Sequence, residues 1–492
     1  MQESKIYRLI EEHYVISLII ITIISAAFHL PHFPKDIISI HAWRQTQTQS
    51  NIVNFYEEDM NVLNPHRNDR GDGLGIFRME FPLMQWMTAV LYKVFGNHII
   101  ITRIFMFVIG VFSVFGMFVM INAVFKNRIA ALIGAWALTF SPSFYYYTIN
   151  PMPDNLALCC SIWGLGLFFI WVRDQKLYKL ILGGIFLSVG VLCKLPFILY
   201  YIVPAVYFGI QFFKNGEKRK AFAHLSIYSC FILFPLAWYL SVISQWKGNG
   251  IVGGVINSTI PVSKTLKFIY FNFVSTLPEL LLNYGSVLFF LSAFYFIVKR
   301  KEFKKPLFVL FAAWGFSAIA YYLFESNMIA TIHDYYLFPF LPILFLLVGY
   351  GAYNLLNSNN KFVRYIAVFM ILVLPLSAYG RMLVRWNPDL PGLNKDLLVY
   401  KADLRSAVPK NALVIAGNDE SHYIFFYYID KKGWGFNDDA LNSNNMKDMI
   451  NRGAKYMYSD SRNMDTNKVI VPFLDSLIME RGTVKVFKLR GN

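Results

Sequence analysis

The chain has 492 residues, of which 56% are hydrophobic and 15% are charged. Soluble domains typically carry about 25% charged residues, so this composition excludes an ordinary soluble protein and predicts many membrane spans. The net charge of +16 is typical of nucleic-acid-binding proteins. Most of it, however, lies in short loops between apolar segments, so no nucleic-acid partner is expected.

Eleven apolar segments have roughly the length that a helix needs to cross a hydrocarbon core. In chain order they are residues 14–30, 99–124, 129–149, 155–172, 179–194, 196–213, 222–244, 279–298, 306–324, 335–356 and 362–384. The first lacks a small-residue cleavage site, so it is predicted to be a retained helix and not a removed signal. One further apolar stretch, residues 81–95, would reach only about 22 Å as a helix.

The charges of the short connections predict the orientation of the chain. Five of them, at 125–128, 173–179, 214–220, 299–305 and 361–364, hold 16 basic and three acidic residues, and the alternate connections hold four basic residues. Positive loops stay in the cytoplasm. The alternation is unbroken if residues 81–95 do not cross, so we predict a juxtamembrane or re-entrant helix there.

Three larger pieces then lie on the outer face, namely the first loop (31–98), a middle loop (245–278) and the tail. The chain is predicted to divide into a transmembrane domain, residues 1–385, and an extracytoplasmic domain, residues 386–492. In the tail, residues 411–416, 454–458 and 484–488 have strand patterns and residues 446–452 a helical one. The predicted fold class is an α-helical polytopic protein of the inner (plasma) membrane with a small C-terminal α/β domain.

The first outer loop holds a polar run, His41-Ala-Trp-Arg-Gln-Thr-Gln-Thr48, within the apolar spacing of a helix. On a helix, His41, Arg44 and Gln45 share one face. An imidazole, a guanidinium and an amide on one face can hold a phosphate and a hydroxyl together. The alternative is the polar face of an interfacial helix, and the spacing alone does not decide between the two.

A second polar run, residues 68–73, carries two aspartates that can bind a divalent cation. Its spacing differs from that of a standard calcium loop, and a solvated turn is the favoured interpretation. No metal site and no cofactor are therefore predicted, and a divalent cation remains as an alternative.

Two carboxylates stand at the outer starts of apolar helices. Glu80 directly precedes Phe-Pro-Leu, and Asp154 follows Pro153. An acid at a helix N-terminus suits the helix dipole, which explains both residues without a function. The same positions are where a membrane enzyme would place acids at the boundary between lipid and water.

Further ionisable residues converge on this outer face, namely Arg103, Lys194 and His333, the last close to Tyr336. Ionisable residues within spans are costly and default to functional candidates. Lys194 can instead snorkel to the interface, and the His333–Tyr336 segment can be part of an interfacial belt. Acids and bases gathered on one membrane face fit group transfer from an anionic lipid carrier.

At these residues the chain resembles the GT-C superfamily of polyprenyl-phosphate-sugar-dependent glycosyltransferases. The closer resemblance is to the bacterial protein mannosyltransferase and aminoarabinose transferase branch (glycosyltransferase family 39-like). The matching features are the long first outer loop, Glu80 before Phe-Pro-Leu, Arg103 after Phe95-Gly96, Asp154 after Pro153, and Lys194 at a helix end. The chain departs from the family in two places: His41 stands where the family has an acid, and Phe81 replaces a lysine frequent in aminoarabinose transferases.

The resemblance implies that a sugar moves from a polyprenyl-phosphate donor to an acceptor hydroxyl on the extracytoplasmic face, with inversion at the anomeric carbon. The acceptor would be a glycan, a lipid or a protein. The candidate residues fall into three groups: catalytic His41, Glu80 and Asp154; donor-phosphate-binding Arg44, Arg103 and Lys194; and substrate-binding Gln45, His333 and Tyr336.

Two other classes of protein remain as alternatives. A transporter or flippase of lipid-linked sugars would carry charged residues deep within several spans and internal symmetry, whereas the ionisable groups here lie mainly at outer helix ends. A lipid-linked glycan ligase or polymerase would use a diphosphate carrier and a similar cationic site, so the sequence does not separate it from a glycosyltransferase.

Overall fold

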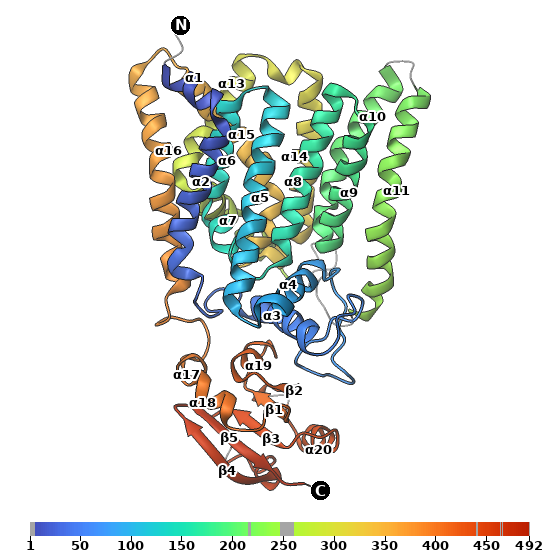
Figure 1. Ribbon diagram of the computed structural model, residues 1–492, viewed down its shortest axis with the longest axis vertical. Helices are drawn as coiled ribbons and strands as arrows, with labels where there is room; N and C mark the ends of the chain where they lie inside the picture. Colours follow the sequence, from blue (N-terminus) through green and yellow to red (C-terminus); the bar gives the residue numbers. More distant parts are fainter. Residues whose placement is uncertain are drawn as a thin grey trace.

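The computed structural model describes residues 5–214, 218–246, 260–438, 441–462, 464 and 466–491. A bundle of long helices forms one part of the molecule, and a small domain of strands and short helices lies at one end of it (Figure 1). The N-terminus is at the opposite end of the bundle from this C-terminal domain (Figure 1).

Eight helical segments among the described residues are long and apolar enough to cross a membrane. They contain α2 (Tyr14–His29), α5 (Ile99–Phe125), α8 (Pro153–Asp174), α10 (Ile202–Lys214), α11 (Lys218–Val242), α14 (Pro306–Ile329), α15 (Leu341–Leu356) and α16 (Lys361–Met382). A short helix, α1 (Lys5–Glu12), precedes them. Each of the eight overlaps a predicted span, and the predicted fold class is confirmed.

The other three predicted spans differ from expectation. Residues 129–149 form α6 (Arg128–Thr139) and α7 (Pro142–Tyr147), because Pro142 cannot continue the first helix. Residues 179–194 form α9 (Leu177–Cys193), which ends before the Lys194-Leu-Pro sequence. It is shorter than each of the eight helical segments of membrane length. Residues 279–298 belong to a pair of arms, Val262–Leu281 and Tyr284–Lys299, bent by 98°. The predicted number of about eleven therefore includes two short helices, and length and composition support eight or nine spans.

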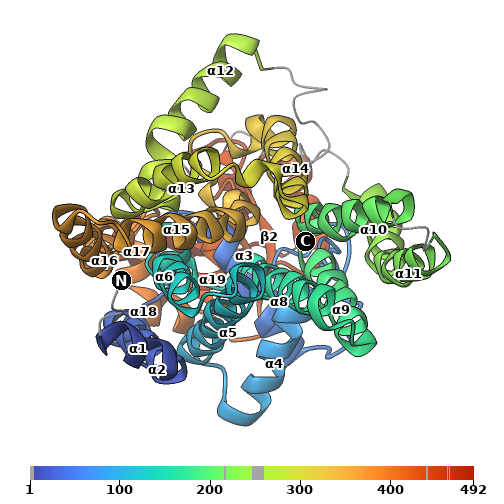
Figure 2. The same cartoon turned by 90° about the horizontal axis from the view of Figure 1, so that it is seen from above.

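The middle loop predicted at 245–278 lies partly outside the described residues, which stop at 246 and resume at 260. The bent pair that follows contains α12 (Val262–Phe271) and α13 (Val287–Lys299). Seen along the bundle, α12 points away from the other helices, whereas α13 lies beside α15 (Figure 2).

The first loop forms two helices at the end of the bundle next to the C-terminal domain. They are α3 (Ala42–Glu57) and α4 (Leu83–Phe95), and they pack on each other (Figure 1). Helix α4 does not run along the bundle and is not among the helices of membrane length. The prediction that residues 81–95 do not cross is thus confirmed.

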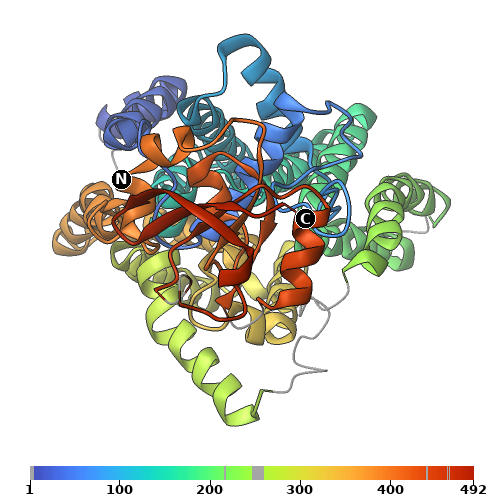
Figure 3. The same cartoon turned by 90° about the horizontal axis from the view of Figure 1, so that it is seen from below.

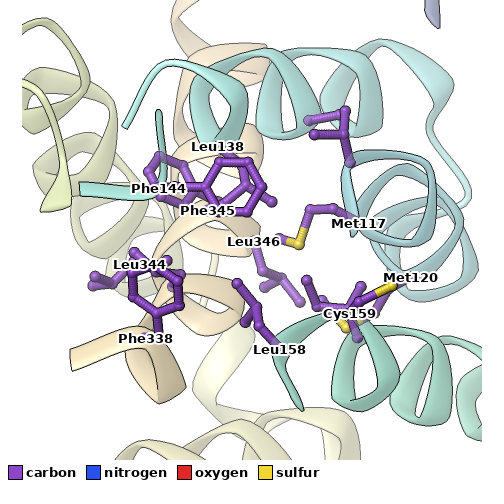
Figure 4. Close-up of a cluster of buried hydrophobic side chains, with 14 of the residues drawn as sticks. Met117, Met120, Leu138, Phe144, Leu158, Cys159, Phe338, Leu344, Phe345 and Leu346 are labelled. Atoms are coloured by element: carbon purple, nitrogen blue, oxygen red, sulfur yellow. The ribbon is translucent and has the colours of Figure 1, made fainter. Parts of the chain in front are cut away.

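The middle of the bundle is held by close packing of α5, α6, α8 and α15. Figure 4 shows a central cluster of their side chains, with Met117, Leu158 and Phe345 among those that meet there. Gly349 of α15 faces α6 so closely that a Cβ on it would lie 2.5 Å from the Ala130 carbonyl oxygen. Small residues at such contacts let helix backbones approach, which is how membrane helices gain packing energy without a hydrophobic driving force.

The C-terminal domain contains one five-stranded sheet in the order β2-β1-β3-β5-β4. The strands are β1 (Leu413–Gly417), β2 (Lys432–Gly435), β3 (Tyr456–Ser459), β4 (Leu474–Arg481) and β5 (Val484–Leu489). Parallel pairs join β1 to β2 and β3, and antiparallel pairs join β5 to β3 and β4. Short helices α17 (Lys395–Val399), α18 (Lys401–Ser406), α19 (Ile424–Ile429) and α20 (Ser443–Asn451) accompany the sheet.

The three strands and the helix predicted in the tail are confirmed as β1, β3, β5 and α20. The two strands that were not predicted lie at the edges of the sheet. One, β2, contains two glycines among its four residues, and the other, β4, is mostly exposed, so neither shows the alternating apolar pattern of a half-buried strand.

The first loop continues the sheet beyond β2. Asp69 pairs with Gly433 as a parallel bridge, flanked by hydrogen bonds from Gly433 N to Asn68 O (3.0 Å) and from Arg70 N to Gly433 O (2.7 Å). Figure 3 shows the C-terminal domain covering this end of the bundle. The solvated turn favoured for residues 68–73 is therefore wrong for Asn68 and Asp69, which are buried between the two parts.

Candidate active site

The candidate site lies where α3, the segment before α4, and the ends of α8 and α9 meet, at the end of the bundle next to the C-terminal domain (Figure 1). Helix α3 begins after His41, whose backbone has a left-handed conformation (φ 56°). Nearly all of the polar side chains in its first half are buried, including Arg44, Gln45 and Thr48. A buried polar face is rare and is retained only where its groups are paired or used. The sequence alternative of an exposed interfacial helix is thereby excluded for α3.

Arg44 and Glu80 form a buried ion pair at the centre of this face. The guanidinium also donates to the side-chain oxygen of Gln47, one turn along α3. Burial acts to raise the pKa of Glu80, but the charges of Arg44 and Lys194 outweigh it and hold that pKa below its usual range. Glu80 is therefore ionised at neutral pH although it is surrounded by protein.

Asp154 and Lys194 form a second pair close to the first. Asp154 lies in the first turn of α8, and its Oδ2 atom is 3.6 Å from the ammonium of Lys194 at the end of α9. The same Oδ2 atom is buried and makes no hydrogen bond within the described structure. The ammonium also faces the rings of Tyr335 and Tyr336, at 5.6 and 5.2 Å from their centroids. A carboxylate oxygen and a cation that are not saturated by protein hydrogen bonds are available to a ligand.

His41 lies at the other end of the site. Its Nε2–H donates to the carbonyl of Ile332 at 2.8 Å, so Nδ1 carries no proton in the neutral ring. The ring stacks on His333, with centroids 5.0 Å apart, and its Nε2 atom is 3.8 Å from Asp334. Burial lowers the pKa of His41 to about 4, against the opposing pull of Asp334. The imidazole is therefore neutral at pH 7.

The lowered pKa predicts how His41 affects stability. A histidine whose pKa is about 4 when folded and 6.5 when unfolded stabilises the fold above pH 6.5, and this contribution is lost as pH falls toward 4. The shift corresponds to at most about 3 kcal/mol. The midpoint temperature of thermal unfolding, measured in detergent, should therefore fall less between pH 7 and pH 4.5 for His41→Gln than for the native protein. Equal losses would show that His41 is not buried in its neutral form.

The other predicted site residues are placed as follows. His333 donates to the Met328 carbonyl at 2.6 Å, and burial lowers its pKa as well. The amide of Gln45 donates to the carbonyl of Ile40 (3.1 Å), and its oxygen is buried without a partner in the described structure.

Arg103 is not part of the cluster. Its guanidinium donates to the carbonyls of Lys35 (3.0 Å) and Asp36 (2.9 Å) and to the side chain of Asn150 (2.5 Å). The bonds to Lys35 and Asp36 tie the start of the first loop to α5, and the predicted contact of Arg103 with the donor phosphate stays a prediction. Sequence spacing had placed Arg103 at the correct end of α5 but could not show its neighbours.

Sequence reasoning missed one buried charged pair. Arg385, just beyond α16, donates to Asp334 at 2.8 Å, and Tyr147 of α7 donates to the same carboxylate at 2.6 Å. One terminal nitrogen of Arg385 is buried without a partner in the described structure. The available signal was an arginine at the outer end of the last predicted span, the same kind of signal that selected Arg103.

The helical bundle, the long first loop and the end domain are the architecture that the resemblance to the GT-C superfamily implied. Residues 80–239 match the family model for dolichyl-phosphate-mannose-protein mannosyltransferase, a segment that includes Glu80, Asp154 and Lys194. The predicted resemblance and the predicted class, a membrane glycosyltransferase, are confirmed at this level. A comparison with curated proteins gave no significant match.

Solved structures share the fold over nearly the whole chain. The chain is similar to ArnT from Cupriavidus metallidurans bound to undecaprenyl phosphate, with a TM-score of 0.67, 13% identity, and 96% of this chain and 98% of that chain covered. The apo form of that protein gives a TM-score of 0.65 at 13% identity, covering 96% and 97%. The Archaeoglobus fulgidus oligosaccharyltransferase in the apo form gives 0.57 at 12% identity, covering 91% and 69%. At such identities the likeness establishes the fold.

Proposed function

We propose that the protein transfers a sugar from a polyprenyl-phosphate donor to an acceptor hydroxyl, with inversion at the anomeric carbon. The observation that carries this proposal is the pairing of two buried carboxylates with two cations, Arg44–Glu80 and Lys194–Asp154, at one end of a membrane bundle. Sugar transfer from a phosphate needs a base for the hydroxyl proton and positive charge for the leaving phosphate. One of the fold relatives has been captured with undecaprenyl phosphate, which supports a lipid-linked donor.

In the proposed reaction the acceptor oxygen bonds to the anomeric carbon as the bond from that carbon to the donor phosphate breaks. The hydroxyl proton passes to Glu80, which is ionised at neutral pH. The polyprenyl phosphate leaves with its new charge facing Lys194 and Arg44. Asp154 holds Lys194 and accepts a hydrogen bond from a substrate hydroxyl at Oδ2, which makes no hydrogen bond within the described structure. No step requires a metal or a cofactor.

The distribution of buried charge favours this proposal over a transporter. Apart from Lys431 in the C-terminal domain, the buried ionic side chains of the described residues gather at the bundle end that carries α3, or on the first loop itself. A pathway across the membrane would need polar groups at several depths. A ligase that uses a diphosphate carrier would need buried charges at the same end of the bundle. An assay must therefore separate it from a monophosphate-dependent transferase by the donor that each uses.

The test is an assay with membranes that contain the protein and a polyprenyl-phosphate sugar labelled in the sugar. The expected result is label in an acceptor together with release of polyprenyl phosphate. Transfer that occurs only from a diphosphate-linked glycan would establish the ligase instead. Movement of the intact labelled lipid across sealed vesicles, without release of polyprenyl phosphate, would establish a transporter.

We further propose that the site faces the extracytoplasmic side of the inner (plasma) membrane. The support is the excess of basic residues in the loops at the opposite end of the bundle, such as 299–305. The acceptor would then be a glycan, lipid or protein that is exposed on that side.

Labelling with a membrane-impermeant maleimide tests this orientation. In a variant with Cys230 replaced by Ala, single cysteines at Asp72 and Asn418 should react in intact cells, since both positions are exposed at the α3 end. A cysteine at Lys301, exposed at the other end, should react only after the membrane is opened. The reverse pattern would place the site in the cytoplasm.

A further inference from the structure

A tyrosine of the C-terminal domain contacts the candidate site. Tyr423 lies directly before α19, and its hydroxyl oxygen accepts hydrogen bonds from the side-chain amide of Gln47 (2.9 Å) and from Arg67 (3.3 Å). Both donors belong to the first loop, and Gln47 is 7% exposed. Tyr423 is thus a contact from a separate domain onto the polar face of α3.

Gln47 connects this tyrosine to the catalytic pair. Its amide nitrogen donates to Tyr423, and its side-chain oxygen accepts from the same guanidinium of Arg44 that binds Glu80. Because a guanidinium only donates, Arg44 fixes the amide oxygen of Gln47 toward itself, and the bond to Tyr423 holds the amide nitrogen at the other end. Without the Tyr423 hydroxyl the amide is held mainly at its oxygen, so the side chain of Gln47 holds Arg44 less firmly.

Tyr423 is itself held in place, because the domain is anchored to the first loop on both sides. On one side Asp36 binds Lys401 and accepts a hydrogen bond from Tyr427 at 3.0 Å. On the other, the backbone of Asn68 bonds to Gly433 at the edge of the sheet. A tyrosine between two such anchors has little freedom to move away from Gln47.

We propose that Tyr423 is a positioning residue, through which the C-terminal domain sets the orientation of Arg44 against Glu80 by way of Gln47. The domain is then part of the working enzyme and not only an appendage. The inference rests on the proposed function in one respect, namely that Glu80 accepts the hydroxyl proton. Tyr423 does not touch the reacting atoms and acts only through the two side chains between them.

The test compares Tyr423→Phe with Tyr427→Phe in the full-length protein. The two variants lose one hydroxyl each, both at α19 and both against the first loop, but only Tyr423 contacts Gln47. Tyr423→Phe should lower kcat about tenfold with little change in the KM for donor, while Tyr427→Phe should stay close to the native rate.

The pH profile supplies a second readout. Arg44 helps to hold the pKa of Glu80 low, so a less ordered Arg44 lets that pKa rise. The acidic limb of the rate profile should therefore move to higher pH in Tyr423→Phe and not in Tyr427→Phe. A merely structural tyrosine would lower the amount of folded protein without moving this limb.

A double-mutant cycle with Gln47→Ala completes the experiment. Tyr423→Phe should add almost nothing once Gln47 is gone, whereas independent sites would multiply their losses. Equal rates and equal pH profiles for Tyr423→Phe and Tyr427→Phe, with Glu80→Gln inactive, would overturn the positioning role alone. An active Glu80→Gln would instead overturn the proposed function.

Discussion

Replacing Glu80 by glutamine is expected to lower sugar transfer by about 10²–10⁴-fold, the usual contribution of a general base. The amide keeps the shape of the side chain but cannot accept the hydroxyl proton. It also leaves Arg44 buried beside a neutral group, so its charge no longer balances that of the carboxylate. The measurement is the initial rate of label transfer in membranes with native and variant protein at matched expression.

A control must separate this chemical loss from unfolding, because removing one partner of a buried ion pair can cost about 3–5 kcal/mol. Glu58→Gln is a suitable match: Glu58 is also a first-loop carboxylate, paired with Arg70 and Lys432 but away from the catalytic cluster. It should keep most of the native rate. The double variant Arg44→Gln with Glu80→Gln removes the unpaired charge, and it should regain stability without regaining activity. A near-native rate for folded Glu80→Gln would contradict the assignment.

Lys194→Met is expected to lower kcat/KM for the donor by about 10²–10³-fold, the loss seen when one group that stabilises a developing anion is removed. The ammonium lies between Asp154 and the rings of Tyr335 and Tyr336, where a departing phosphate would find an unsaturated cation. The rate should be measured against donor concentration. Lys93→Met is the matched control, since Lys93 belongs to α4 and bonds the carbonyl of Tyr56, apart from the catalytic cluster.

The charge and the shape of Lys194 can be separated with a second variant. Lys194→Arg keeps the charge opposite Asp154, so the fold should be retained, but a planar guanidinium does not reproduce a compact ammonium. Its kcat/KM should fall between those of Lys194→Met and the native enzyme. If Lys194→Met and Lys93→Met have the same kcat/KM for the donor, Lys194 does not bind the donor phosphate.

Much of the architecture follows from local chemistry. The apolar lengths and the basic loops identified the membrane segments and placed residues 81–95 outside the bundle, because both signals lie within short stretches of chain. Glu80, Asp154 and Lys194 could be found for the same reason: each is an ionisable residue at the end of an apolar helix.

What could not be predicted depends on contacts between distant segments. Asp334 and Arg385 are 51 positions apart and meet only when the ends of two helices pack together. Arg103 carried the same signal as Lys194, yet its partners are backbone carbonyls of the first loop and the side chain of Asn150. The lowered pKa of His41 likewise arises from burial that its position in a polar run conceals.

The contact between the C-terminal domain and the first loop could not be predicted from the sequence either. The pairing of Asp69 with Gly433 joins segments separated by most of the chain, and a glycine at a sheet edge has no side-chain signal for a partner. Tyr423 is one of many tyrosines in the chain, so only the folded structure distinguishes it as the one that touches Gln47.

The most direct test of the central claim is the rate of label transfer from a polyprenyl-phosphate sugar by Glu80→Gln, Asp154→Asn and His41→Ala, measured side by side at matched expression. We expect large losses for the two carboxylate variants and a smaller one for His41→Ala, since His41 bonds the Ile332 carbonyl and stacks on His333, away from the two paired carboxylates. Near-native rates for all three would contradict the claim and place the chemistry elsewhere in the molecule.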